Sequence, residues 1–196
     1  MLPKIYLCST NAKKISEFTK LIPTIIPLDR DLTERPIRLE EIQSFDPAKV
    51  VKHKLDQLLS YAYRGPAIYL VEDTSFFAHS LSGFPGPYIK DFFNVIGAHK
   101  FSELCKGDAC IKTYIGALFI NSECIVSHTK IYEGSQECTV HDAVKKFDDC
   151  SVLNDYDCIV SAKDSNVMFC EDQSTKLHRT RAIKSFHDDL IKENLI

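Results

Sequence analysis

"AIYLVEDTSFF", residues 67–77, is the stretch on which the expected fold of this chain depends. Residues 67–71 form a short, continuous apolar run, as in a strand that is covered on both faces. Glu72, Asp73 and Thr74 follow, so the run predicts a strand with two carboxylates at its carboxyl end. These acids are either solvated at the end of the strand or part of a metal or acid–base site, because open α/β sheets bind ligands at this edge.

The segments around this strand alternate between strand and helix patterns, which predicts a mixed central β-sheet flanked by helices in one α/β domain, residues 1–196. The glycines and prolines of residues 82–90 predict a shaped loop after it. The other expected elements are a strand at 4–9, helices at 11–22 and 46–63, a helix at 88–105 broken at Gly97, paired strands at 111–121 and 124–136, and a helix at 175–193.

Two of these helices carry clear signals of their ends and buried faces. Asp46 is a good N-cap, and Pro47 suits the first helical position of the 46–63 helix. Apolar spacing predicts these inward-facing residues: Ile15, Phe18 and Leu21 or Ile22 in the first helix, Val50, Leu55, Leu58 and Leu59 in the second, and Ala182, Ile183, Phe186 and Leu190 in the last.

Composition limits the classes of function. A net charge of −3 and a pI near 6.2 argue against general electrostatic binding of a nucleic acid polymer. No apolar run approaches the ~20 residues of a membrane span, and the N-terminus does not have the pattern of a signal peptide. The eight cysteines lack zinc-site spacing, so we expect buried, reduced thiols in a soluble cytoplasmic protein.

Three further segments carry groups that can bind an anion or a metal. "STNAKK", residues 9–14, leads into a helix whose first amides and Lys14 favour an anion. "LEEIQS", residues 39–44, supplies Glu41, and "KLHRTRA", residues 176–182, supplies a cationic helix start. Each has a plainer interpretation as a helix cap, an acidic turn or a solvated cationic face. Together, carboxylates and cations suit Mg²⁺ bound with a polyphosphate.

"STNAKK", "EIQS", "VEDTSFFAHSLSGFPGPYIKDFF" and "LHRTRA" occur in the order and approximate spacing of the inosine triphosphate pyrophosphatases. The chain resembles this family from residue 4 to about 190, most closely in its first 95 residues. The resemblance implies an elongated mixed sheet with a cleft between two lobes, and a homodimer. It also implies Mg²⁺-dependent hydrolysis of non-standard purine nucleoside triphosphates (ITP, dITP and XTP) to a nucleoside monophosphate and pyrophosphate.

The resemblance also implies roles for individual residues. Glu41 and Asp73 would hold Mg²⁺, and Asp73 would also orient or deprotonate the attacking water. The triphosphate would lie on residues 9–14, with Ser9, Thr10, Asn11 and Lys14 as contacts. The remaining nucleotide contacts would be Lys54, Thr74, Lys90, Tyr156, Asp157, Gln173, His178 and Arg179.

The part of the chain that would read the base departs from the family pattern. Asn154 and Asp155 stand where the family has an aromatic residue and a glycine, and Leu177 stands where it has a serine. The family's base-reading lysine falls on Gln173, so it is either lost or displaced onto Lys176.

The altered base pocket leaves three hypotheses open. The first is an active pyrophosphohydrolase with a shifted base preference. The second is a non-catalytic nucleotide-binding homologue that acts as a sensor or interaction module. The third is a structural or protein-binding role for the cysteine-rich hairpin region.

Overall fold

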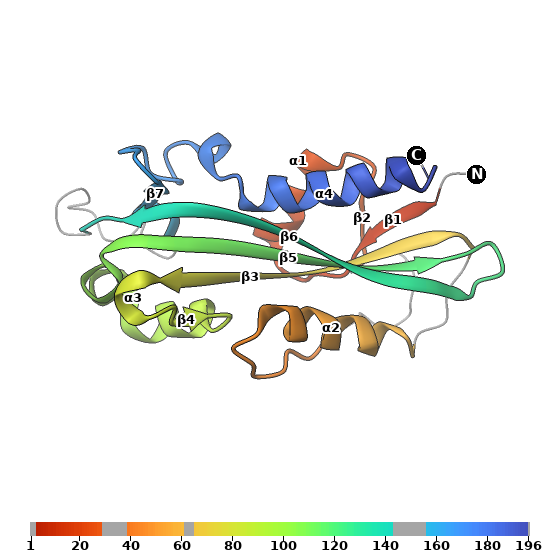
Figure 1. The fold of residues 1–196 in the computed structure, drawn as a ribbon, viewed down its shortest axis with the longest axis horizontal. Coiled ribbons are helices and arrows are strands. Elements are labelled where there is room, and N and C mark those ends of the chain that lie inside the picture. The colour runs from red at the N-terminus through yellow and green to blue at the C-terminus, as the bar shows by residue number, and fades with distance from the viewer. Residues whose placement is uncertain (1–2, 29–38, 61–64, 143–155, 196) are drawn as a thin grey trace.

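The computed structural model describes residues 3–28, 39–60, 65–142 and 156–195. Within these ranges the chain forms one mixed sheet with strand order β2-β1-β3-β5-β6-β7, and β4 pairs separately with β3. The strands are β1 (Lys4–Leu7), β2 (Ile26–Pro27), β3 (Ala67–Ala78), β4 (Pro85–Gly86), β5 (Gly107–Ile120), β6 (Val126–Val140) and β7 (Val160–Ala162). The predicted α/β fold with an elongated mixed sheet is confirmed (Figure 1).

The long spine of the sheet is made by β3, β5 and β6. β5 pairs antiparallel with β3 from Ala67↔Ile120 to Ala78↔Ala109, and with β6 along nearly its full length. The hairpin predicted at 111–121 and 124–136 is therefore present, with both strands longer than expected. β1 runs parallel to β3 but pairs only with residues 67–70.

The helices are α1 (Ala12–Leu21), α2 (Pro47–Leu58), α3 (Ile89–Cys105) and α4 (His178–Lys192). α1 and α4 lie on one face of the sheet and α2 lies on the opposite face (Figure 1). The core follows this division, because Phe18 and Phe186 pack with Ile68 and Leu70, whereas Val51 and Leu55 pack with Tyr69 and Val71. A third apolar cluster joins α3 to the far end of β3 through Phe76, Phe93 and Phe101.

Several local predictions are confirmed. The side chain of Asp46 caps α2, with Pro47 at its first turn. The plainer interpretation of residues 9–14 as a helix cap also holds, because the side chain of Asn11 caps α1. α3 is broken at Gly97, whose φ of 72° places it in the left-handed region that glycine tolerates. The four predicted inward residues of α4 are all buried: Ala182, Ile183, Phe186 and Leu190.

Other local predictions are wrong. α2 ends at Leu58, and Leu59 is 48% exposed because it lies just past the last helical turn; Val51 occupies the buried face instead. The choice left open in the first helix falls on Ile22, which packs against the core, whereas Leu21 is exposed. Residues 61–63 of the expected helix lie outside the described residues.

Close packing of α4 on β6 depends on Gly134. A Cβ at this position would collide with the carbonyl oxygen of His178 and with the backbone of Ala182. The missing side chain therefore lets the start of α4 approach the strand, which fixes where His178 and Arg179 lie.

The described cysteines are free thiols. Cys105, Cys110, Cys138 and Cys158 are buried as predicted, whereas Cys124 and Cys170 are exposed; Cys150 lies outside the described residues. Among the described residues, no helix has the length and apolar character that crossing a membrane requires.

Candidate active site

The candidate site lies where one edge of β3 has no neighbouring strand. β1 pairs with this edge up to Leu70, and β4 pairs with it again at Phe76 and Phe77. Between them, the carbonyl oxygen of Glu72 accepts a hydrogen bond from Lys54 Nζ at 3.0 Å instead of from a strand. No strand therefore pairs with this edge of β3 between Leu70 and Phe76, and the site forms around this gap.

The prediction that Glu72 and Asp73 end their strand is wrong, because β3 continues to Ala78. Both carboxylates lie in the middle of the strand, where successive side chains point to opposite faces. Glu72 and Thr74 therefore point towards α1 and α4, and Asp73 points towards α2 with Ser75. The two adjacent acids therefore lie on opposite sides of the site, Glu72 on the α1 and α4 side and Asp73 on the α2 side.

A cavity of about 730 Å³ lies at this open edge. Its lining includes most of the predicted site residues: Ser9, Thr10, Asn11, Lys14, Glu41, Lys54, Asp73, Thr74, Lys90, Tyr156 and Arg179. Three predicted residues, Asp157, Gln173 and His178, do not line it. Lys13, which belongs to the predicted segment 9–14, and Lys176, the alternative position for the base-reading lysine, also line it. Glu17, Glu72, Phe93 and Asn94 line it without having been predicted there.

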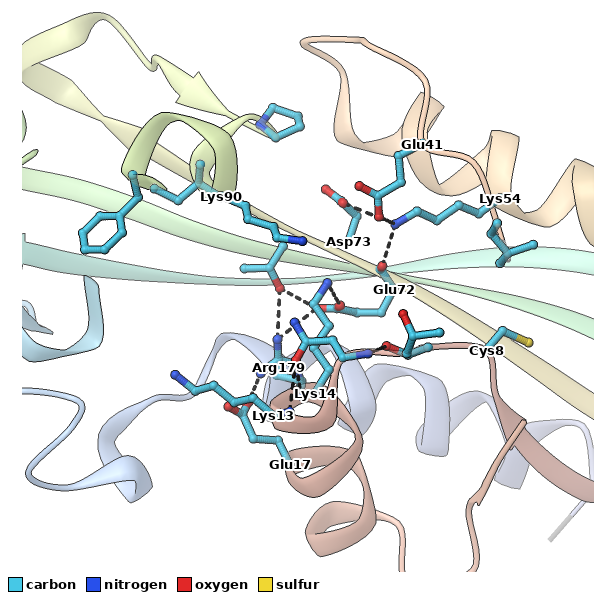
Figure 2. A pocket seen from close by; sticks show the side chains of 18 of the residues that line it. Cys8, Lys13, Lys14, Glu17, Glu41, Lys54, Glu72, Asp73, Lys90 and Arg179 are labelled. Atoms are coloured by element: carbon cyan, nitrogen blue, oxygen red, sulfur yellow. Dashed lines mark hydrogen bonds and ion pairs between the residues drawn. The ribbon is translucent and has the colours of Figure 1, made fainter. Parts of the chain in front are cut away.

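On the α2 side of the cavity, Lys54 lies between two carboxylates (Figure 2). Its Nζ is 2.6 Å from Glu41 Oε1 and 3.5 Å from Asp73 Oδ1. Burial raises the pKa of Asp73 to about 6 against the opposing charges of Lys54 and Lys14. Burial alone would also raise the pKa of Glu41. The neighbouring charge of Lys54 outweighs this effect, so the pKa of Glu41 is lowered.

On the α1 side, Glu72 joins two cations. Its Oε2 is 2.6 Å from Lys14 Nζ, and its Oε1 is 3.0 Å from Arg179 Nη2. Arg179 also pairs with Glu17 and donates to Thr74 Oγ1 at 3.1 Å (Figure 2). Burial alone would lower the pKa of Lys14, but the charges of Glu72 and Asp73 outweigh it, so the pKa is raised and Lys14 stays cationic.

The predicted anion site at the start of α1 is partly used by the helix itself. Asn11 Oδ1 accepts from the backbone amides of Lys13 and Lys14 at 3.0 and 3.2 Å. These amides are therefore satisfied by the cap, and Lys14 Nζ is the stronger anion ligand of this segment.

Lys90 enters the cavity from the opposite wall, at the start of α3 (Figure 2). Within the described residues it makes no ion pair, in contrast to Lys14 and Lys54. Its charge is thus available to an anionic ligand.

At the end of the cavity near η4 (Tyr156–Cys158), Asp157 holds two lysines. Its carboxylate is 2.5 Å from Lys13 Nζ and 2.9 Å from Lys176 Nζ. Burial would raise the pKa of Asp157, but the charges of Lys176 and Lys13 outweigh it, so the pKa is lowered and the carboxylate is ionised. Lys176 Nζ also lies 5.8 Å from the centre of the Tyr156 ring, which lines the cavity.

Three side chains lie differently from their predicted roles. Gln173, in η5 (Gln173–Thr175), is exposed and donates to the carbonyl oxygen of Phe169 at 2.6 Å, whereas Lys176 lines the cavity. His178 is fully buried behind Thr113. Asp157 acts through its lysines and not at the cavity surface.

The hydroxyl of Thr74 already makes three hydrogen bonds within the protein. It donates to Glu72 and contacts Arg179 and Thr113.

Two residues of the site had little or no signal in the sequence. Glu72 was indicated only by its place beside Asp73 in a predicted strand, and no local pattern indicated Thr113. Leu177 is 37% exposed, and Asn154 and Asp155 lie outside the described residues.

Comparison with known proteins agrees with this architecture. Curated inosine triphosphate pyrophosphatases from Encephalitozoon intestinalis and Encephalitozoon cuniculi are 40% and 38% identical over 101 residues, which is 52% of this chain. These alignments span 47% and 48% of the two relatives, about half of their length. A relative of the same name from Mycosarcoma maydis is 30% identical over 105 residues, 54% of this chain and 52% of the relative.

Solved structures show the same fold over nearly the whole chain. The Staphylococcus aureus Ham1 protein matches with a TM-score of 0.67 and 18% identity, covering 96% of this chain and 98% of that one. A HAM1 protein from Coxiella burnetii matches with a TM-score of 0.60 and 16% identity, covering 98% and 100%. A profile of the Ham1 family matches residues 5–189, and on this match the chain belongs to the Ham1 family.

Proposed function

We propose that this protein hydrolyses non-standard purine nucleoside triphosphates, such as ITP, dITP and XTP, to a nucleoside monophosphate and pyrophosphate with Mg²⁺. The observation that carries this proposal is the cavity at the open edge of β3, where Glu41 and Asp73 face Lys14 and Lys90. Carboxylates for a metal and cations for phosphates are the groups that phosphoryl chemistry needs together. The names of the curated relatives point to the same reaction.

The carboxylates on the α2 side fit Mg²⁺. The described residues contain no cluster of three or more metal-ligating side chains, but Mg²⁺ takes one or two carboxylates and completes its shell with water and phosphate oxygens. Glu41 and Asp73 would hold the ion, and Lys54, which lies between them, shows that this position already favours a cation. Bound there, Mg²⁺ would neutralise charge on the phosphates.

Asp73 is the residue best suited to accept a proton from the attacking water. It is buried, its pKa of about 6 leaves it mostly ionised at neutral pH, and Ser75 and Lys54 fix its orientation. A general base works best with a pKa near the working pH. Lys14 and Lys90, on opposite walls, would hold the triphosphate in line with this carboxylate.

The Asp157 cluster would receive the base. Lys176 offers only hydrogen-bond donors, which suit the 6-keto oxygen of hypoxanthine or xanthine and do not suit the 6-amino group of adenine. Tyr156 and Phe93 line the same end and offer ring faces for a planar base. We therefore assign base reading to Lys176 in place of Gln173. From the family resemblance alone, we also propose a cytoplasmic homodimer.

The test is a panel of ITP, dITP, XTP, GTP and ATP, with pyrophosphate and orthophosphate measured separately. We expect pyrophosphate as the product, and loss of a preorganised base in Asp73→Asn should lower kcat by about 10²–10⁴ with the fold retained. Asp188→Asn, at an exposed position on α4, is the control and should be unaffected. Tight nucleotide binding without turnover would favour the sensor hypothesis, and a fully active Asp73→Asn would refute the assignment of the base.

A further inference from the structure

A chain of buried hydrogen bonds crosses the sheet from α4 to the open edge of β3. His178 Nδ1 lies 2.6 Å from Thr113 Oγ1 in β5, and Thr113 Oγ1 lies 3.0 Å from Thr74 Oγ1 in β3. Thr74 in turn donates to Glu72, which holds Lys14 and Arg179. His178 and Thr113 are both fully buried, so no solvent competes for these bonds.

The carboxylate of Glu72 fixes the direction of every bond in this chain. Glu72 forms ion pairs with Lys14 and Arg179, and the oxygens of a carboxylate in such pairs only accept hydrogen bonds. Thr74 has one hydroxyl hydrogen and donates it to Glu72, so it accepts from Arg179 and from Thr113. Thr113 then has no hydrogen left for His178, and its oxygen must accept from His178 Nδ1.

The bond from His178 Nδ1 to Thr113 also fixes where the imidazole carries its hydrogen. Burial lowers the pKa of this imidazole to about 3, so the ring is neutral at neutral pH. A neutral ring carries one hydrogen, which the chain places on Nδ1. Nε2 is then an unprotonated acceptor, and it is buried without a hydrogen-bond partner among the described residues.

We propose that Thr113 is a positioning residue that fixes His178 as the Nδ1–H tautomer and orders Thr74 and Glu72 beside the cavity. Glu72 in turn pairs with Lys14 and Arg179. The Thr113 hydroxyl would therefore help to fix the positions of Arg179 at the start of α4 and of Lys14 at the start of α1. The structural part of this inference stands alone, and its consequence for turnover rests on the proposed function.

Substitution of Thr113 separates the hydroxyl from the packing. Thr113→Val keeps the shape of the side chain but leaves the buried Nδ1–H of His178 without its acceptor. Because Nε2 has no partner among the described residues either, no hydrogen bond then favours one tautomer, and the ring should become a mixture of both. Thr113→Ser keeps the hydroxyl and should preserve the chain. Thr129→Val, at an exposed position on β6, is the matched control for the same chemical change.

The direct test is nitrogen NMR of the full chain with ¹⁵N-labelled histidine at neutral pH, because protonated and bare ring nitrogens have distinct shifts. His178→Asn identifies the His178 signals by their loss. We expect a protonated Nδ1 and a bare Nε2 in the wild type, Thr113→Ser and Thr129→Val, and in Thr113→Val the averaged or doubled shifts of a mixture of the two tautomers. A wild-type ring protonated at Nε2, or Thr113→Val with an unchanged spectrum, would overturn the proposal.

Kinetics test the positioning role separately. Thr113→Val should lower kcat/KM for pyrophosphate release about 10-fold, as typical for loss of an orienting partner. Thr113→Ser should restore it. Unchanged kcat/KM in folded Thr113→Val would refute the positioning role. A wild type that releases no pyrophosphate would instead count against the proposed function, while the tautomer measurement still decides the hydrogen-bond chain.

Discussion

His178 should make the stability of this protein fall as the pH is lowered below 7. Burial lowers its pKa to about 3, with Lys176, Lys13 and Lys14 acting in the same direction and Asp157 against it. In the unfolded chain the same imidazole has a pKa of about 6.5. The unfolded state therefore takes up a proton near pH 6.5 that the folded state refuses until about pH 3.

The sign and size of the effect follow from this difference. The contribution of His178 to the free energy of unfolding is fully present above pH 6.5 and is lost as the pH falls towards 3. One proton corresponds to about 1.4 kcal/mol per pH unit, so lowering the pH from 7 to 4.5 should cost about 2.5 kcal/mol.

The measurement compares urea unfolding, followed by circular dichroism between pH 7 and 4.5, in the wild type and His178→Asn. Asparagine does not titrate, and its amide can still donate to Thr113, so the difference between the two curves isolates the imidazole. His187→Asn, at an exposed position of α4, should follow the wild type. Parallel curves for the wild type and His178→Asn would show that the burial of this ring does not govern its charge.

Three further outcomes follow from the site and the packing. A chelator should abolish pyrophosphate release with little change in Tm, because two carboxylates are too few for a structural cage; a large fall in Tm, or activity in excess chelator, would contradict this. Lys176→Ala should relax discrimination between ITP and ATP by roughly 10²-fold in the ratio of kcat/KM values, whereas Gln173→Ala should not; the opposite result would return base reading to Gln173. Gly134→Ala should destabilise the fold by about 3 kcal/mol in urea unfolding, because the new Cβ meets the backbone of α4. Gly116→Ala meets only side chains and should cost less; equal losses would argue against the backbone collision.

The sequence alone was sufficient for features that depend on neighbouring residues. The caps at Asn11 and Asp46, the break at Gly97 and the buried face of α4 are set within one or two turns of chain. The same holds for the hairpin of β5 and β6, whose two strands follow one another directly in the chain. The motifs at residues 9–14, 39–44, 71–93 and 177–182 together indicated many of the residues that line the cavity, since each motif lies on one short segment.

Tertiary structure decided which partners the side chains of these segments contact. β3 runs past its two acids because β5 pairs with it along its whole length, and that pairing partner lies some 40 residues away in the chain. Alternation along the strand then sends Glu72 to Lys14 and Arg179, and Asp73 to Lys54. No local pattern specifies which helix covers which face.

The base end of the cavity and the buried chain behind it also depended on long-range contacts. Lys176 points into the cavity because Asp157 holds it there, while Gln173, only three residues earlier, turns to the carbonyl of Phe169. Thr113 carries no sequence signal, since a lone threonine in a strand is ordinary. It gains its role only because the sheet register places it opposite Thr74, and because Gly134 lets α4 bring His178 against it.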